Sequence, residues 1–365
     1  MSPKTIKTRE MEFEIIRGSI ERSVKASNGK AFVAEGDSLE LLKKFPSNSI
    51  SLILTDPPYH STKKGNIQGD TAFKEDAHYI EWMEKYIKEW KRILKPNGSL
   101  FCFCSPAMSA RLEVAFSNEF NILSQIVWTK PNDPGFDGWK QKMKKESLRQ
   151  WYSHTERIIF AEPAYHGNLH RSYFGNLLRT VRRQAGLSAH QLTALTGAHG
   201  KVNHGGAVSN WEAGRNIPSR EQYKKICNAL IRTKKITKMP EYEDAIRPFK
   251  TDSSREFTDV WTFPSVKPFK GKHPAEKPVS LLEHAIEAST YRGDIVLDCF
   301  SGSGNTGIAA IKIGRRAILI DLDPVWVARS SLVVEISHHI DETTLEQIKK
   351  PIITKVQVAQ SRLFA

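Results

Sequence analysis

The chain has 365 residues and a formal net charge of +14, and this length suits one large domain with a smaller one beside it. A positive excess of this size favours a polyanion such as DNA or RNA as the partner, although solvated lysines that only maintain solubility would give the same excess. No run approaches the roughly 18 consecutive apolar residues of a membrane helix, and the first residues lack the apolar core of a secretory signal.

The cysteines give no sign of a metal site or of disulfides. Cys102, Cys104, Cys227 and Cys299 are scattered without the spacing of zinc ligands or of a disulfide framework. Cys102 and Cys104 alternate within an apolar run, which predicts positions in the core. We therefore expect no metal and a reduced, cytoplasmic setting.

Strand and helix patterns alternate through the first part of the chain. The spacing of apolar residues predicts strands at 31–34, 51–55, 99–104, 122–129 and 157–161 and helices at 39–44 and 79–94. Ser38 is the predicted cap of the first helix, and the Pro-Asn-Gly sequence at 96–98 predicts a turn before the next strand. The strand at 51–55 stops at Pro57 and Pro58, because two prolines cannot continue a central ladder.

The middle of the chain has a different pattern. From about 175 to 231 it is wholly helical, with helices predicted at 177–185, 189–196 and 203–213 and a last one after Pro218. Ser188 is the predicted cap of the second helix and Gly197 its end. The arginines of the first helix, at 179, 182 and 183, are expected to face outward.

Strand and helix patterns resume at 294 and continue to about 337, with a further helix predicted at 344–349 and an apolar strand at 352–358. The α/β pattern is therefore split in two by a small helical unit. We divide the chain into 1–172, the first part of the α/β domain; 173–235, the helical insert; 236–272, a linker; and 273–365, the second part of the α/β domain.

A glycine-rich loop follows the buried strand predicted at 295–297. Gly302, Gly304 and Gly307 have the spacing of a dinucleotide-binding loop, and Asp321 ends the next strand nineteen positions beyond Gly302. Glycines let a cofactor approach the backbone, and a carboxylate at the next strand end can accept hydrogen bonds from ribose hydroxyls. These needs are common to adenosine cofactors, so the loop leaves NAD, S-adenosylmethionine and a purely structural turn open.

The tetrapeptide Asp56-Pro57-Pro58-Tyr59 directly follows a buried strand, at a carboxyl strand end, where α/β folds place their chemistry. The exocyclic amine of a base is a poor nucleophile because its lone pair is delocalised into the ring. A carboxylate that accepts from this NH2 group would favour tetrahedral nitrogen, so Asp56 is predicted to orient and polarise the amine. Tyr59 offers a flat face on which an extruded base can stack. A strand-terminating turn capped by Asp56 is the structural alternative.

With this tetrapeptide the chain resembles the S-adenosylmethionine-dependent amino-methyltransferases that act on adenine N6 or cytosine N4 of DNA. Other stretches resemble further motifs of that family, namely Gly36-Asp37-Ser38, Leu94-Lys95-Pro96-Asn97-Gly98, Trp128-Thr129-Lys130-Pro131, His154-Thr155-Glu156, His273-Pro274-Ala275-Glu276-Lys277-Pro278, Asp298 to Gly304 and Asp321-Leu322-Asp323-Pro324. The resemblance implies Asp56, Pro57, Pro58 and Tyr59 as catalytic residues. For the cofactor S-adenosylmethionine it implies Asp37, Ser38, Asp56, His273, Lys277, Pro278, Asp298, Phe300, Gly302, Ser303, Gly304, Asn305, Thr306, Asp321 and Leu322.

The catalytic tetrapeptide precedes the glycine loop, which is the motif order of the family's β class. The resemblance therefore implies a Rossmann-like, mostly parallel, seven-stranded sheet with circularly permuted motif order and the first sequence strand beside the last. It also implies double-stranded DNA as the partner, a homodimer, and the option of a cognate restriction endonuclease. Asp at position 56 favours adenine N6, because cytosine-N4 enzymes of the family more often carry Ser there.

The insert resembles a helix-turn-helix module of the phage-repressor type at residues 187–192 and 209–218. In such modules the third helix enters the major groove. The candidate DNA contacts are Ser209, Asn210 and Arg215, then Lys201, Asn203 and His204 in a long turn, and Lys140, Lys142, Lys144, Lys145 and Arg149 in a basic segment before the insert. A small helical scaffold that only positions the basic segment is the alternative.

Two functions of other classes stay open. A DNA-binding regulator with an inactive methyltransferase half would use the charge and the insert, but it gives no reason for an intact Asp56 and intact glycines. An NAD enzyme would use the glycine loop and leave the tetrapeptide without a role. We therefore expect a site-specific adenine-N6 DNA methyltransferase that flips its target base, with a cytosine-N4 methyltransferase as the next alternative.

Overall fold

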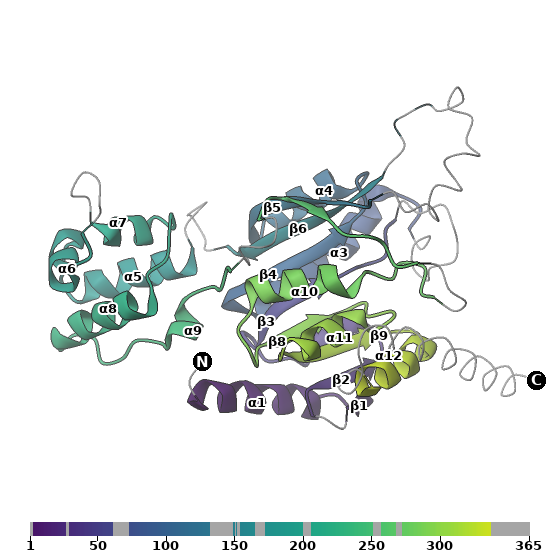
Figure 1. The fold of residues 1–365 in the computed structure, drawn as a ribbon, viewed down its shortest axis with the longest axis horizontal. Helices are drawn as coiled ribbons and strands as arrows, with labels where there is room; N and C mark the ends of the chain where they lie inside the picture. The colour runs from purple at the N-terminus through teal and green to yellow at the C-terminus, as the bar shows by residue number, and fades with distance from the viewer. Residues whose placement is uncertain are drawn as a thin grey trace, which may run out of the picture.

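The computed structural model describes residues 3–26, 29–60, 73–131, 149, 151, 154–164, 172–199, 206–250, 257–267 and 272–336. In these residues a large α/β body carries a small helical lobe at one end, drawn in teal at the left of Figure 1. No helix within these ranges has the length and apolar character needed to cross a membrane. The elements predicted at 344–349 and 352–358 lie outside the described residues.

The body is built on one sheet in the order β1-β2-β9-β8-β3-β4-β6-β5-β7. Its strands are β1 Ser23–Lys25, β2 Ala31–Glu35, β3 Ile50–Thr55, β4 Leu94–Cys104, β5 Phe120–Thr129, β6 Thr155–Pro163, β7 Val260–Thr262, β8 Ile295–Asp298 and β9 Arg316–Asp321. Five of the eight pairings are parallel, so the sheet is mixed but mostly parallel, as predicted. The first predicted strand, β2, lies beside β9, the last strand among the described residues, in agreement with that expectation.

The described sheet has nine strands, and the expected number of seven is wrong. The additional strands are β1 and β7, three residues each, at the two edges of the sheet. Three residues are too few to show the alternation of polar and apolar side chains by which a strand is recognised in a sequence. Each of these strands forms because a longer neighbour, β2 or β5, offers its backbone groups.

The turn predicted at 96–98 is also absent, because these residues belong to β4. Ile50 pairs with Leu94 and Leu52 pairs with Ser99, so four residues of β4 bulge opposite one residue of β3. A Cβ at position 98 would lie 2.9 Å from the carbonyl oxygen of Ser51, and glycine allows this approach.

Helices cover both faces of the sheet (Figure 1). They are α1 Pro3–Gly18, α2 Ser38–Leu42, α3 Asp76–Ile93, α4 Ser109–Ser117, α10 Val279–Ser289, α11 Asn305–Lys312 and α12 Pro324–Ile336. Buried side chains of α1 to α4 pack with Ile50 and Ile53 of β3 on one face. Those of α10 to α12 pack with Leu52 and Leu54 on the other face. The side chains of this buried strand thus contribute to two separate cores, one on each face of the sheet.

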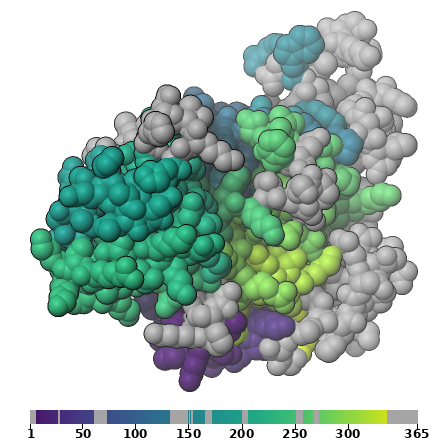
Figure 2. Space-filling model, turned by 60° about the vertical axis from the view of Figure 1, so that its left-hand side comes forward, coloured from purple at the N-terminus to yellow at the C-terminus, as the bar shows by residue number. Residues whose placement is uncertain are grey.

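The insert has a core of its own and forms the teal and green lobe of Figure 2. Its helices are α5 Tyr173–Gln184, α6 Ala189–Thr196, α7 Ala207–Glu212, α8 Arg220–Arg232 and α9 Tyr242–Ala245. Ser188 caps α6 through a capping box, and Gly197 ends this helix in the left-handed region at φ 65°, as predicted. The predicted helix at 203–213 is shorter than expected, because α7 begins at Ala207.

Arg182 of α5 is buried, and the expectation that it faces outward is wrong. Its guanidinium donates to both carboxylate oxygens of Glu212, at 2.5 and 3.0 Å, and to the carbonyl oxygen of Leu187 at 2.6 Å. A buried charge requires such a partner. The pair therefore joins α5 to the end of α7.

The stretch expected as a linker, 236–272, is partly packed. Ile236 and Ile246 join the core of the insert, and β7 joins the sheet. The Asn97 side chain of β4 donates to the carbonyl oxygens of Glu243 and Ile246, at 2.8 and 3.2 Å. The insert is therefore attached to the body at this point.

Candidate active site

β3 and β8 lie side by side and parallel at the centre of the sheet, so their carboxyl ends meet at one edge. Asp56 directly follows β3, and Asp298 is the last residue of β8. From β3 the chain continues to β4 on one side, and from β8 it continues to β9 on the other. Ligands of α/β folds bind in the crevice outside such a switch point.

A cavity of about 650 Å³ occupies this crevice, a size typical of small-molecule sites. The predicted site residues that line it are Asp37, Ser38, Asp56, Pro57, Pro58, Tyr59, His273, Lys277, Asp298, Phe300, Gly302, Ser303, Asn305, Thr306, Asp321 and Leu322. Pro278 and Gly304, which directly precede α10 and α11, are not among the lining residues. The fold therefore brings the tetrapeptide and most of the predicted cofactor residues to one place.

Asp56 belongs to a cluster of charged side chains. Lys277 Nζ donates to Asp56 Oδ2 at 2.6 Å and lies 3.2 Å from Glu156 Oε2. The Tyr59 hydroxyl donates to the same Glu156 oxygen at 3.0 Å, and Lys130 pairs with Glu156 Oε1. Two ammonium groups thus face two carboxylates. Asp56 Oδ1 is buried and has no hydrogen-bond partner among the residues that the structure describes.

The pKa values in this cluster depend on both burial and pairing. Burial raises the pKa of Asp56, and the ammonium of Lys277 partly offsets this rise. Burial also acts to raise the pKa of Glu156, but the ammonium groups of Lys277 and Lys130 outweigh it and lower that pKa to about 2. Burial disfavours the charged form of Lys277, yet the two carboxylates outweigh it and raise the pKa of the lysine. Lys277 is therefore cationic and Glu156 anionic at neutral pH.

Glu156 and Lys130 are site residues that the sequence reasoning did not select, and Lys277 was expected to bind the cofactor. A sequence signal exists, because both new residues are charges at the ends of apolar strands: Glu156 lies in β6, and Lys130 directly follows β5. The missing information is that β5 and β6 are antiparallel, which places the end of one beside the start of the other.

Two carboxylates hold the glycine loop. Asp298 accepts from the hydroxyls of Thr55 and Thr306 at 3.0 and 2.6 Å, and burial raises its pKa to about 6 despite these bonds. Asp321 accepts from the backbone N–H of Gly302 at 2.7 Å, and Gly302 has a φ of 46°. These bonds fix the loop against the cavity before any ligand binds.

The loop fits a cofactor with an adenosine part. Ser301 Oγ is buried, lines the cavity and has no hydrogen-bond partner in the described part of the chain. A Cβ at position 302 would lie 3.1 Å from the ring of His273, so glycine is needed there. The cap of α2 is Asp37 and not Ser38, whose hydroxyl forms a hydrogen bond with the hydroxyl of Tyr86. Both capping bonds of Asp37 use Oδ1. Its other oxygen can accept from a ligand in the cavity.

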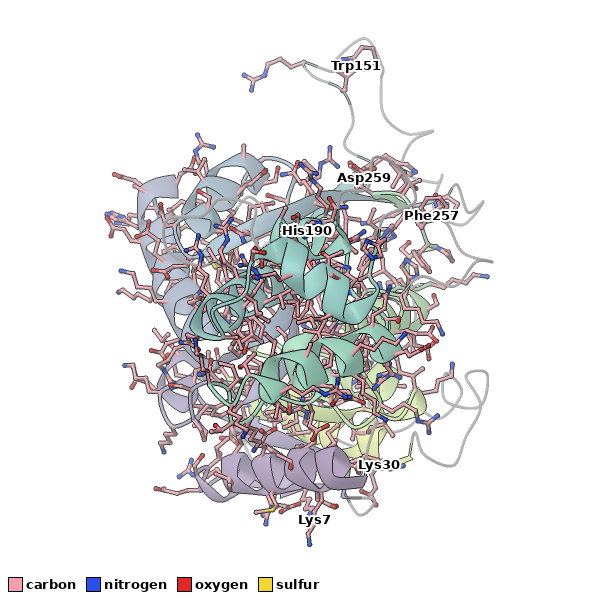
Figure 3. All side chains as sticks on the ribbon, turned by 90° about the vertical axis from the view of Figure 1, so that its left-hand side faces the viewer. Lys7, Lys30, Trp151, His190, Phe257 and Asp259 are labelled. Carbon is pink, nitrogen blue, oxygen red and sulfur yellow. The ribbon has the colours of Figure 1, made fainter. Side chains whose placement is uncertain are left out.

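Among the predicted DNA-binding residues that the structure describes, none lines this cavity. Those outside the described residues are Lys140, Lys142, Lys144, Lys145, Lys201, Asn203 and His204. Arg149 and Ser209 are exposed, and Arg215 Nη1 donates to Asn210 Oδ1 at 3.2 Å. Trp151, two residues after Arg149, is 96% exposed and stands away from the body in Figure 3.

The comparison with known proteins agrees with this site. The sequence profile of the N6/N4 methylases, described as DNA methylase, matches residues 50–330. The DNA adenine methyltransferase YhdJ of Escherichia coli (strain K12) is 26% identical over 322 residues, which cover 87% of each chain. The type II methyltransferase M.PvuII of Proteus hauseri is 24% identical over 351 residues, which cover 90% of this chain and 89% of that one.

The solved structure of the PvuII DNA methyltransferase (cytosine-N4-specific) matches with a TM-score of 0.51 at 18% identity, covering 92% of this chain and 96% of that one. This match shows the same α/β fold. S-adenosylmethionine is the methyl donor of the family. The chain therefore belongs to the N6/N4 DNA methylase family and is an S-adenosylmethionine-dependent DNA amino-methyltransferase.

Proposed function

We propose that the chain methylates N6 of a flipped adenine in double-stranded DNA, at a specific sequence, with Asp56 as the acceptor that holds the amine. The observation that carries this proposal is Asp56 Oδ1, a buried acceptor without a described partner, on a side chain that lines the cavity. An incoming NH2 group would satisfy this oxygen. The resulting bond favours tetrahedral nitrogen and makes its lone pair available.

The proposed cofactor residues are those predicted from the family motifs, apart from Asp56 and Lys277, which contact each other. Phe300, Gly302 and Ser303 present the glycine loop to the cavity, and Asp37 and Asp321 offer carboxylate oxygens to the donors of an adenosine. When bound, S-adenosylmethionine supplies a methyl group on a sulfonium that is already a good leaving group. The task of the protein is therefore to hold the two reactants in line.

The target base is proposed to stack on Tyr59. The hydroxyl of this residue donates to Glu156 at 3.0 Å, which orients the ring before a base arrives. Phe103 and Trp128 also line the cavity and add apolar surface for a flat ligand. Extrusion of a base into such a pocket costs a few kcal/mol of stacking, which these contacts offset.

The choice of adenine rests on Asp at position 56. The relative YhdJ is named an adenine methyltransferase, whereas the PvuII enzyme is cytosine-N4-specific. Asp56 supports adenine because the family's cytosine enzymes more often carry Ser at this position.

Site selection is proposed to reside in the insert, acting as a helix-turn-helix with α7 as the recognition helix. Ser209 is exposed on α7, and the ion pair between Arg182 and Glu212 fixes this helix to α5. A homodimer and a cognate restriction endonuclease belong to the same proposal and rest on the resemblance of the sequence motifs; the relative M.PvuII is named a type II methyltransferase.

The test is methylation of unmodified DNA of diverse sequence by the purified protein with labelled S-adenosylmethionine, followed by nucleoside digestion and single-molecule sequencing. We expect N6-methyladenine at one sequence motif, and no transfer by Asp56→Ala even though S-adenosylhomocysteine still binds. Asp259→Asn, an exposed carboxylate outside the cavity, is the control and should keep the wild-type rate.

Other outcomes separate the alternatives. N4-methylcytosine without N6-methyladenine would replace adenine as the substrate. No transfer by the folded protein to any DNA would favour the regulator with an inactive methyltransferase half. Replacement of Ser209 and Asn210 by Ala should relax the sequence choice, and unchanged selectivity would argue against direct readout by α7.

A further inference from the structure

We propose that Lys277 is the counter-ion that keeps Asp56 ionised as an acceptor, and that Glu156 limits how much of this positive charge acts on Asp56. This inference rests on the proposed role of Asp56. It assigns Lys277 to the catalytic carboxylate rather than to the cofactor, where the sequence resemblance placed it.

The contact between Lys277 and Asp56 leaves the reactive oxygen open. Lys277 lies 221 positions away in the chain, yet its Nζ is 2.6 Å from Asp56 Oδ2. The two side chains are only 8% and 16% exposed, so little water screens the pair. Because the bond uses Oδ2, one carboxylate can hold the ammonium and, through Oδ1, the amine of a base at the same time.

Asp56 needs such a partner because it is buried. A protonated carboxyl has lost the negative charge that polarises an amine, and burial moves Asp56 in that direction by raising its pKa. An ammonium group in contact lowers the pKa of a carboxyl by about 1–3 units. The contact with Lys277 therefore extends the range of pH in which Asp56 is an acceptor.

Glu156 has the opposite effect on Asp56. Its Oε2 lies 3.2 Å from Lys277 Nζ, so it shares the lysine with Asp56. Its own negative charge also raises the pKa of Asp56, and Lys130 neutralises this charge only in part through the pair with Oε1. Removal of the Glu156 charge and removal of the Lys277 charge should thus move the titration of Asp56 in opposite directions.

The other groups around Asp56 do not supply a second cation in contact with it. The titratable groups that face it are Tyr59 after β3, Cys102 and Cys104 of β4, Glu156 of β6 and Asp298 of β8. Burial raises the pKa of both thiols, so they are neutral at physiological pH. Among the described residues, Lys277 is therefore the cation in contact with Asp56.

The experiment measures the single-turnover rate of methyl transfer to DNA against pH for the full chain. Lys277→Met should move the acidic limb of the profile upward by about 1–3 pH units, with the rate recovering at high pH. Glu156→Gln keeps an acceptor for the Tyr59 hydroxyl and should move the limb downward. Lys277→Arg keeps the positive charge and should stay near the wild-type limb.

Lys95→Met is the matched control. Lys95 is also a buried lysine, 7% exposed, and its Nζ is 2.6 Å from Glu12 Oε2, but it does not line the cavity. Its loss should lower stability and leave the acidic limb in place. A shift in this variant equal to that of Lys277→Met would overturn the assignment to Lys277.

A second readout does not depend on activity. The infrared carbonyl band of a protonated carboxyl, assigned to Asp56 by its loss in Asp56→Asn, should titrate at higher pH in Lys277→Met than in the wild type. An unshifted band and an unshifted rate profile would overturn the proposal. So would a variant that loses only S-adenosylhomocysteine binding, which would return Lys277 to the cofactor.

Different results would exclude the proposed function of Asp56 and the proposed role of Lys277. Full activity of Asp56→Ala would remove the proposed function of Asp56 itself. An inactive Asp56→Ala combined with an unshifted Lys277→Met would remove only the role of Lys277. If Lys277→Met does not fold, the rate profile of Glu156→Gln tests the proposal instead. An acidic limb of that profile that stays at the wild-type pH or moves to higher pH would contradict the proposal.

Discussion

Replacement of Asp298 by Asn should make the protein more stable at neutral pH. Asp298 is 4% exposed, and its Oδ1 accepts from the hydroxyl of Thr55 and the N–H of Phe300 at 3.0 and 3.2 Å. Its Oδ2 accepts from the hydroxyl of Thr306 at 2.6 Å. The amide oxygen of Asn can keep the first two bonds, and its NH2 group can donate to the Thr306 hydroxyl, which also accepts. The charge is removed, and the Thr306 hydroxyl loses the acceptor for its own proton, so the gain calculated below is an upper limit.

The expected size follows from the pKa of Asp298, which burial raises from 3.8 to about 6. The folded state binds this proton more tightly than the unfolded state. The stability that the protein gains from this proton on Asp298 is therefore complete below pH 3.8 and is lost as the pH rises through about 6. A difference of about 2.2 units at about 1.4 kcal/mol per unit corresponds to about 3 kcal/mol. Asp298→Asn avoids this loss, so its advantage should grow with pH to at most about 3 kcal/mol at pH 8.

The assay is urea unfolding of both proteins between pH 5 and pH 8, followed by circular dichroism. Asp259→Asn is the control, because this carboxylate is exposed and its loss should leave the midpoint unchanged at each pH. An advantage of Asp298→Asn that does not change with pH, or a variant that is less stable throughout, would refute the reasoning. A more stable variant that no longer binds S-adenosylhomocysteine would show that the charge is kept for the cofactor.

Three further substitutions test other parts of the structure. Arg9→Met should lower the free energy of unfolding, measured in urea, by about 3–5 kcal/mol, because it leaves Asp294 as a buried carboxylate without its cation. Asp294 Oδ1 is 3.0 Å from Arg9 Nε, and an unchanged urea midpoint would contradict the prediction. Gly304→Ala should cost about 1–2 kcal/mol in the same assay, because the residue has a φ of 81° and an added Cβ would lie 3.0 Å from Ser330 Cα; wild-type stability would show that the loop relaxes at no cost. Arg182→Met should free α7 from α5 and lower site selectivity more than the methylation rate on a library of sites, whereas equal losses would make the insert a scaffold.

Local patterns predicted local structure well. The apolar runs before Asp56 and before the glycine loop are observed as β3 and β8, because a short apolar segment stopped by prolines or glycines has few other conformations. Ser188 and Gly197 bound α6 where predicted, since a cap bonds to residues within one turn of itself. The three-residue edge strands and the bulge in β4 were not predicted, because they depend on backbone groups of other strands.

The partners of buried charged side chains could not be predicted from the sequence either. Arg182 has the sequence position of an outward-facing helical residue, and it is buried only because Glu212 of another helix can pair with it. Lys277 has a predicted place in a cofactor motif, and it contacts Asp56 only because the chain brings the segment before α10 to the end of β3. Spacing along the chain carries no information about such partners.

The sequence by itself determined the family, the α/β alternation, the separate helical unit and the two loops that form the site, because each depends on residues close together in the chain. Only the tertiary structure decided that β3 and β8 are neighbours and that Lys277 and Glu156 surround Asp56. The charge state of Asp56 depends on burial and on ammonium groups within a few ångströms. These are properties of distance in space, and the order of residues does not state them.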